Sequence, residues 1–144
     1  MRVAGPDDAP LLFPLFTIFY GEHFHPPTIE AIRDHLSAAE AVDTVLLATV
    51  RERPAGFASL RILPQIESYA PHVELSDLFV DEAFRRQGIG TALLRSAEDL
   101  ARIRGAPRLY VLTGFDNEEA KAFYRGLGFE DHALGMKKSL DSPP

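Results

Sequence analysis

The stretch from Glu74 to Thr91 constrains the fold of this 144-residue chain more than any other. Residues 73–80 are rich in apolar and β-favouring side chains, which predicts a strand. A charged connection follows over residues 81–86, and apolar residues then recur at helical spacing from Gly88 to Arg104. A strand, a glycine-bearing turn and a helix start predict an anion site. The first amides of a helix lack internal partners, and the helix dipole is positive there.

Two common phosphate-binding motifs are excluded at this turn. A Walker loop ends in Gly-Lys followed by Ser or Thr, whereas Gly90 is followed by Thr91 and Ala92. A dinucleotide fingerprint needs a third glycine at the position where Leu93 stands. The anion must therefore be recognised by a different pattern.

The rest of the chain alternates helices and strands as expected for one mixed α/β domain. The first helix is predicted over residues 9–20, capped by Asp7, with Pro14 causing a kink or a late start. A second helix starts at Thr28, and the last helix is capped by Asp116. Residues 64–71 are predicted as a loop. The predicted central sheet has six to seven strands, at residues 2–4, 44–50, 56–62, 73–80 and 108–113 and within residues 129–138, and is accompanied by about four helices.

Composition narrows the chemistry. The chain has no cysteine, which excludes disulfides and a thiol nucleophile and fits a reducing cytoplasm. A net charge of −6 argues against a nucleic-acid surface. The apolar run from Leu11 to Tyr20 is too short to span a bilayer and lacks the flanks of a signal peptide, so no membrane partner is expected. His23 and His25 form a His-x-His pair without a third ligand, so no metal is expected.

Two motifs resemble one family. The run Arg85-Arg86-Gln87-Gly88-Ile89-Gly90 resembles the Gln/Arg-x-x-Gly-x-Gly/Ala signature of the GNAT superfamily of N-acetyltransferases. Residues 117–129 are similar to the family's Asn-x-x-Ala-x-x-Phe-Tyr-x-x-x-Gly-Phe segment. The resemblance covers residues 73–138 and implies a single GNAT-like domain over residues 1–144, with splayed central strands. Residues 1–72 would then form the acceptor-side half and residues 73–138 the coenzyme A-binding half.

By this resemblance the co-substrate is acetyl-coenzyme A. Its pyrophosphate would meet the backbone amides of the glycine turn, with Arg85 or Arg86 adding charge. Its pantetheine arm would pair with the predicted strand at residues 73–80 as an additional strand. A backbone amide near Phe79 or Val80 would polarise the thioester carbonyl. The ordinary structural alternatives are a connecting turn for residues 85–91, a core strand for residues 78–80 and a helix cap for Asn117. The residues expected to bind the cofactor are Leu78, Phe79, Val80, Arg85, Arg86, Gln87, Gly88, Ile89, Gly90, Thr91, Asn117 and Tyr124.

The resemblance also implies the proton-transfer groups. Tyr124 would protonate the departing thiolate, although a core aromatic is the alternative. Glu74 matches the position of a general base in some relatives, whereas others place an acid where Ser76 stands, so the identity of the base stays open. Strand alternation predicts Glu74 and Ser76 on one face of the sheet, with Asp77 and Phe79 on the other. Asp77 is a candidate to bind the amine.

The predicted activity is direct acetyl transfer to a primary amine of a small molecule or peptide. Residues 1–77 carry eleven acidic and five basic side chains, whereas residues 78–144 carry ten of each. Chance variation on solvated faces explains this as well as function does. The functional interpretation is a cationic acceptor, such as a polyamine, a lysine-like amine or an aminoglycoside, rather than an acidic amino acid. A catalytically silent acyl-coenzyme A sensor, a longer acyl group and a homodimer are the alternatives left open.

Overall fold

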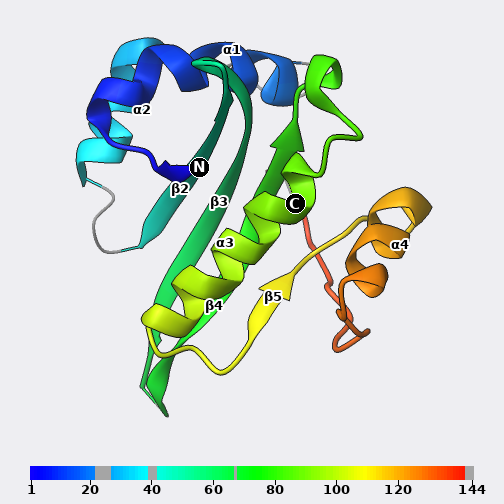
Figure 1. Ribbon diagram of the computed structural model, residues 1–144. Coiled ribbons are helices and arrows are strands. Elements are labelled where there is room, and N and C mark those ends of the chain that lie inside the picture. Colours follow the sequence, from blue (N-terminus) through cyan, green and yellow to red (C-terminus); the bar gives the residue numbers. More distant parts are fainter. Residues whose placement is uncertain (22–26, 39–41, 67, 142–144) are drawn as a thin grey trace. The chain divides into compact units, whose positions relative to one another are not determined.

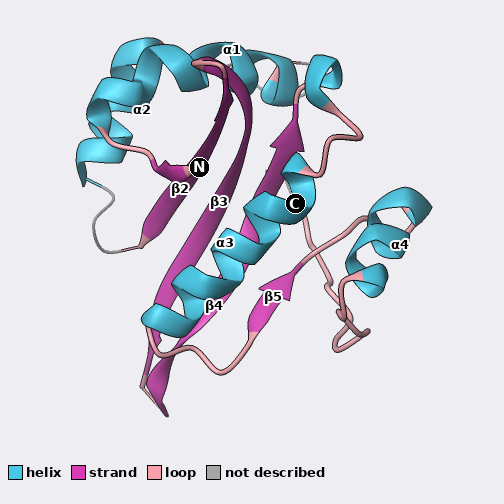
Figure 2. Cartoon of the chain, in the orientation of Figure 1, coloured by secondary structure: helices cyan, strands magenta, loops and turns pink. Residues whose placement is uncertain are grey.

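The computed structural model describes residues 1–21, 27–38, 42–66 and 68–141. The chain divides into two compact units, the first unit over residues 1–111 and the second unit over residues 112–144. The elements are β1 (Arg2–Val3), α1 (Ala9–Tyr20), α2 (Ile29–Ala38), β2 (Asp43–Val50), β3 (Arg53–Gln65), β4 (Ser68–Val80), α3 (Ile89–Ile103), β5 (Leu109–Val111) and α4 (Glu118–Gly126), with 3-10 turns at Pro6–Asp8 and Glu82–Phe84 (Figures 1 and 2). Within these described ranges, no helix is both long and apolar enough to cross a membrane.

The first unit holds a five-stranded mixed sheet in the order β1-β2-β3-β4-β5. Neighbouring strands are antiparallel except β4 and β5, which are parallel. The prediction of six to seven strands is therefore wrong for the part of the chain that is described. The missing strands were expected within residues 129–138, where no strand is found up to residue 141. All side chains from Glu130 to Asp141 are exposed, so this segment lacks the buried face that stabilises a strand.

Helices cover both faces of the sheet in the first unit (Figure 1). On one face, α1 and α2 contribute Leu12, Leu15 and Ile32 to a core that includes Phe57 of β3. On the other face, α3 packs its buried side chains against β2, β3 and β4. Pro14 lies inside α1 on its exposed side, and the helix keeps its predicted bounds without a late start. The N-cap of α1 is Asp8 rather than Asp7.

The predicted loop over residues 64–71 is wrong, because β3 and β4 form one long hairpin. Their pairing continues through Leu63 opposite His72 to Gln65 opposite Ser68. The pairing of β2 with β3 reaches only to Arg61, and that of β5 with β4 starts at residue 73. Each arm of the hairpin tip therefore has one open edge. Proline is tolerated at such an edge because no ladder hydrogen bond is lost there, which explains Pro64 and Pro71.

One extra residue interrupts β4. Strands β2 and β3 pair regularly from Asp43 and Arg61 up to Ala48 and Gly56. On the other side of β3, Ser59 faces Asp77, whereas the next residue, Leu60, faces Leu75. Ser76 is therefore a β-bulge, and its Oγ donates a hydrogen bond to the Ser59 carbonyl at 3.1 Å.

The bulge changes which side chains of β4 share a face. Glu74 stands opposite Arg61, Asp77 opposite Ser59 and Phe79 opposite Phe57. Because the three partners alternate regularly along β3, they lie on one face, and so do the three β4 residues. The prediction that Glu74 and Asp77 lie on opposite faces is wrong, since it assumed an uninterrupted strand. Both carboxylates lie on the face that α1 and α2 cover.

Gly56 permits the close approach of β3 and β4 at the end of the hairpin that is furthest from its tip. A Cβ at this residue would lie 2.5 Å from the Phe79 carbonyl oxygen and 3.3 Å from Leu93 Cδ1. We expect Gly56→Ala to lower the free energy of unfolding by about 1–3 kcal/mol, because the strands must shift to relieve the overlap. Gly5→Ala is the control, since no atom lies within 4 Å of its added Cβ. Urea unfolding measures both, and equal stability of the two variants would contradict this account of the packing.

Candidate functional site

The turn after β4 exposes backbone amides at the start of α3. Arg86 and Gly88 adopt left-handed φ angles of 63° and 78°, which reverse the chain before the helix. Gly88 is the N-cap and offers no side-chain cap. The first hydrogen bond within the helix is donated by the Ala92 amide to the Gly88 carbonyl at 3.0 Å. The amides of Ile89, Gly90 and Thr91 precede that bond and point out of the helix end, as an anion requires.

Two arginines come just before these amides in the sequence. The side chains of Arg85 and Arg86 are both exposed. Arg85 Nε donates to the Val80 carbonyl at 3.1 Å, which ties the turn to the end of the strand. No atom lies within 4 Å of the position that a Cβ on Gly88 would take. Positive charge, outward amides and open space in front of the glycine together fit a diphosphate group.

The end of β4 leaves one backbone edge unpaired by the strands of the first unit. The ladder with β5 ends at Leu75 opposite Val111, and β4 continues to Val80. The Asp81 amide donates to the Ala55 carbonyl at 2.8 Å, so by alternation the Phe79 amide faces β3 and the Val80 amide faces the opposite edge. Of the two amides predicted to polarise a carbonyl, that of Val80 faces away from β3, and its role remains a prediction.

Asp77 and Tyr20 form a hydrogen-bonded pair on the α1 face of the sheet. Tyr20 Oη donates to Asp77 Oδ2 at 2.8 Å. Burial raises the pKa of Asp77, and the hydrogen bond from Tyr20 and the charge of Arg61 partly oppose this rise. Burial, followed by the contact with Asp77, raises the pKa of Tyr20, which keeps the hydroxyl protonated as a donor. Tyr20 was not predicted as a site residue, because it ends an apolar helix far from Asp77 in sequence.

Further charged groups accompany this pair on the same face. Arg61 Nε lies 3.7 Å from Asp43 Oδ1, and His35 Nε2 lies 3.4 Å from Asp43 Oδ2. Glu74 Oε2 lies 3.7 Å from His72 Nε2. The bulge at Ser76 thus places the predicted base, Glu74, and the predicted amine ligand, Asp77, on the face of the sheet that α1 and α2 cover.

Asn117 belongs to the second unit and caps α4. Its Oδ1 accepts a hydrogen bond from the Ala120 amide at 3.1 Å, so the prediction that Asp116 is the cap is wrong. The Asn117 side chain satisfies an amide that would otherwise lack a partner. Its contact with the pantetheine arm remains a prediction.

Tyr124 lies near the end of α4 in an aromatic group of the second unit. Its ring meets those of Phe123 and Phe129 edge-on, at centroid distances of 5.3 and 5.4 Å. Gly128, with φ 94°, ends the helix, and the Phe129 amide donates to the Tyr124 carbonyl at 3.0 Å. This pattern is a Schellman motif, which returns Phe129 onto the helix. The spacing of Tyr124, Gly128 and Phe129 therefore has a local structural cause, and the role of Tyr124 as an acid remains a prediction.

In the described ranges, no three side chains of the types that hold metals gather into one site. His23 and His25, the pair considered from the sequence, lie outside those ranges.

With this geometry in place, comparison with known proteins identifies the family. The profile of the Acetyltransferase (GNAT) family matches residues 10–129, so the chain belongs to that family. The predicted resemblance is confirmed. A glucosamine 6-phosphate N-acetyltransferase from Trypanosoma brucei brucei is 30% identical over 110 residues, which cover 76% of this chain and 73% of that protein.

Two more comparisons agree on the family and the fold. An aminoglycoside N(6')-acetyltransferase type 1 from Klebsiella aerogenes is 36% identical over 92 residues, covering 62% of this chain and 60% of that protein. The solved structure of a putative acetyltransferase from Agrobacterium tumefaciens superposes with a TM-score of 0.84 at 26% identity, covering 96% of this chain and 97% of that one. Several other curated relatives match over less than half of their own length.

Two substitutions test the Tyr20–Asp77 pair. We expect Asp77→Asn to keep or raise the free energy of unfolding at pH 7, because an amide oxygen still accepts from Tyr20 and the half-buried charge is removed. Tyr20→Phe should lower the free energy of unfolding by about 1–2 kcal/mol, since the carboxylate loses its donor. Urea unfolding at several pH values measures both.

The pH dependence follows from the raised pKa of Asp77. An acid whose folded pKa is raised destabilises the fold when it ionises, so the advantage of Asp77→Asn should shrink as pH falls through that pKa. If Asp77→Asn is instead less stable than Tyr20→Phe at pH 7, the charge of Asp77 stabilises the fold and the assignment is wrong.

Proposed function

We propose that the chain is an acetyl-coenzyme A-dependent N-acetyltransferase that acetylates a primary amine in a ternary complex. The observation that carries the proposal is one continuous segment, Val80 to Thr91, that offers an open strand edge, two arginines and a capless helix start in order. A long ligand with a thioester at one end and a diphosphate further along matches this order of groups. Family membership supports the same reading.

The residues present fit the cofactor. The outward amides of Ile89, Gly90 and Thr91 suit the diphosphate, and Arg85 and Arg86 add positive charge beside it. The open edge of β4 suits an extended arm with amide groups, which would pair with it as an added strand. When bound, the cofactor supplies an acetyl group already activated as a thioester.

The chain's own groups would then handle charge and protons. The Val80 amide would donate to the thioester oxygen as negative charge develops there. Asp77 would hold the acceptor's ammonium group, and Glu74 would take its proton before attack, directly or through water. Tyr124 would return a proton to the departing sulfur. The chain has no cysteine to carry the acyl group, which favours direct transfer.

Relatives named for amine acceptors support acetyl transfer to nitrogen, although the names concern those proteins. The alternative function is an acyl-coenzyme A sensor that binds the cofactor without turnover. An assay that follows release of free thiol from acetyl-coenzyme A over a panel of amines, with mass spectrometry of the products, separates the two. Binding without any acetylated amine would favour the sensor.

One prediction of the proposed function concerns the glycine turn. Acetyl-coenzyme A at 100 times its dissociation constant should stabilise the wild type by roughly 2.7 kcal/mol. Gly90→Glu should remove this gain through added bulk and like-charge repulsion, and Gly90→Gln should remove part of it through bulk alone. Thr49→Glu adds the same charge at an exposed residue of β2 and serves as the control. A full ligand-induced thermal shift in Gly90→Glu would refute the assignment of the turn.

A further prediction of the proposed function concerns proton transfer. Tyr124→Phe and Glu74→Gln should each reduce kcat by about 10²–10⁴ with little change in cofactor affinity, because each removes one acid or base. Their pH profiles should differ. Loss of the base should abolish the rise of kcat/KM with pH that it causes, whereas loss of the acid should leave that rise in place. An unchanged kcat in either variant, when chemistry limits turnover, would return that residue to a structural role.

A further inference from the structure

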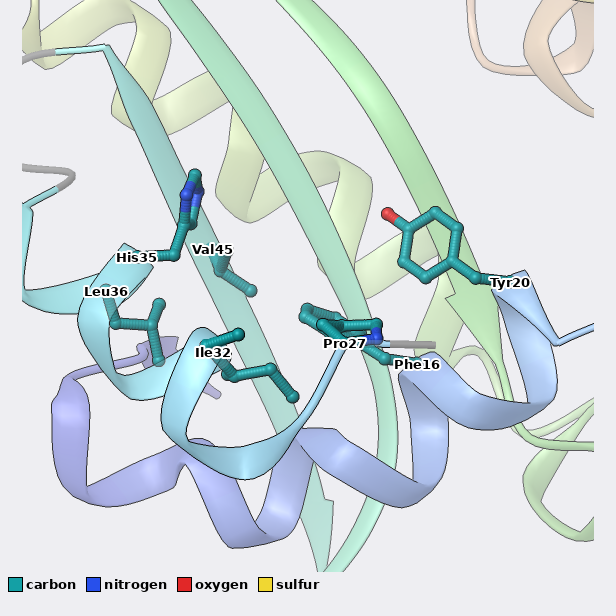
Figure 3. A pocket seen from close by; sticks show the side chains of 8 residues that line it. Phe16, Tyr20, Pro27, Ile32, His35, Leu36 and Val45 are labelled. Carbon is teal, nitrogen blue, oxygen red and sulfur yellow. The ribbon is translucent and has the colours of Figure 1, made fainter. Parts of the chain in front are cut away.

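A pocket of about 300 Å³ lies beside the Tyr20–Asp77 pair, between α1, α2 and β2 (Figure 3). Its wall is mostly apolar, and its lining residues are Phe16, Tyr20, Pro27, Ala31, Ile32, His35, Leu36 and Val45. In Figure 3, the His35 ring and the Tyr20 hydroxyl lie toward one end of the pocket, and Ile32 and Leu36 lie toward the other. The pocket therefore has an apolar interior and a polar end.

Negative charge is concentrated at the polar end. The Tyr20 hydroxyl is bonded to the Asp77 carboxylate at 2.8 Å, and His35 lies 3.4 Å from the Asp43 carboxylate. Arg61 is the cation that acts on both Tyr20 and Asp77, and it already lies 3.7 Å from Asp43. The carboxylates of Asp77 and Asp43 outnumber the guanidinium of Arg61 among these groups, so a cation is favoured at this end.

We infer that this pocket binds a small apolar group, aromatic or branched, whose amino group lies at the polar end beside Asp77. The inference rests on the proposed function and narrows its acceptor to compact primary amines with an apolar substituent. The predicted classes of polyamine and aminoglycoside fit the pocket less well. Their many polar groups would lose water against walls where, among the described lining residues, Tyr20 and His35 alone carry polar side-chain atoms.

The size of the pocket supports one ring with a short linker. A cavity of roughly 150 Å³ is enough to hold benzene, so about twice that volume accommodates a ring and two or three further carbons. It is at the lower limit of the roughly 300–1,000 Å³ of ligand pockets, which argues against an acceptor of several rings bound as a whole.

The test compares primary amines that carry a compact apolar group with amines that lack one. Acetylation is followed with 2-phenylethylamine, 3-methylbutylamine, ethylamine, 1,4-diaminobutane and kanamycin. We expect kcat/KM for the first two to exceed that for ethylamine by at least about tenfold, since each buried methylene group contributes several-fold. Equal or higher kcat/KM for ethylamine, 1,4-diaminobutane or kanamycin would overturn the inference.

A matched pair of variants tests the location. Ala31→Phe places a ring into the pocket from an exposed residue of α2, and Ala38→Phe adds the same ring to an exposed residue of α2 that does not line it. Ala31→Phe should raise KM for 2-phenylethylamine at least tenfold while leaving KM for acetyl-coenzyme A unchanged, and Ala38→Phe should change neither. Circular dichroism and thermal unfolding confirm that both variants fold. If Ala31→Phe affects all amines equally, the apolar group does not bind in this pocket.

Calorimetry separates failure of the inference from failure of the proposed function. Binding of 2-phenylethylamine to the wild type, and its loss in Ala31→Phe, is measured without acetyl-coenzyme A. Binding without any acetylation of the panel would keep the pocket assignment and refute acetyl transfer. Acetylation of other amines without binding of 2-phenylethylamine would keep the proposed function and refute the pocket assignment.

Discussion

The single extra residue in β4 is the constraint that puts Glu74 and Asp77 on the same face of the sheet. With Ser76 in the strand, Glu74 stands opposite Arg61 on the face covered by α1 and α2. Without it, Glu74 would point toward the buried packing of α3. A carboxylate placed there without a partner would cost several kcal/mol or lose its charge. The extra residue brings the two acidic side chains to one face, and the hydrogen bond from Ser76 Oγ to the Ser59 carbonyl adds a contact across the bulge.

The turn that follows β4 contains a strained backbone conformation. Arg86 adopts a left-handed φ, a conformation that costs a residue other than glycine about 1–3 kcal/mol. Gly88 adopts the same left-handed region at little cost. It is the N-cap of α3, and no side chain caps the helix there. A serine at this position would have to adopt the same left-handed φ, and that cost exceeds the few tenths of a kcal/mol by which a serine cap improves on glycine. Glycine therefore forms this turn with little strain and leaves the first amides of α3 without a side-chain cap.

Local patterns in the sequence predicted the elements whose ends are marked by local chemistry. The bounds of α1 and the extents of β2 and α3 followed from apolar residues at helical spacing and from a run of β-favouring residues. The hairpin tip was missed because its two prolines are acceptable only on open edges, which depend on the neighbouring strands. The bulge and the Tyr20–Asp77 bond were missed for a similar reason. Both are set by pairing between distant segments, and neither leaves a local pattern in the chain.

Strand β4 presents two kinds of chemical group to two sides. Its edge near Val80 offers main-chain amides, which are the same whatever side chain a residue carries. Its face offers Glu74 and Asp77, whose identity a single codon change can alter. Substitutions on the face can therefore accumulate without disturbing hydrogen bonding at the edge. Under the proposed function, the amine acceptor could therefore diverge in a lineage of such proteins while the edge that would hold the thioester is kept. Descendants with unrelated acceptors are the expected evolutionary outcome of this arrangement.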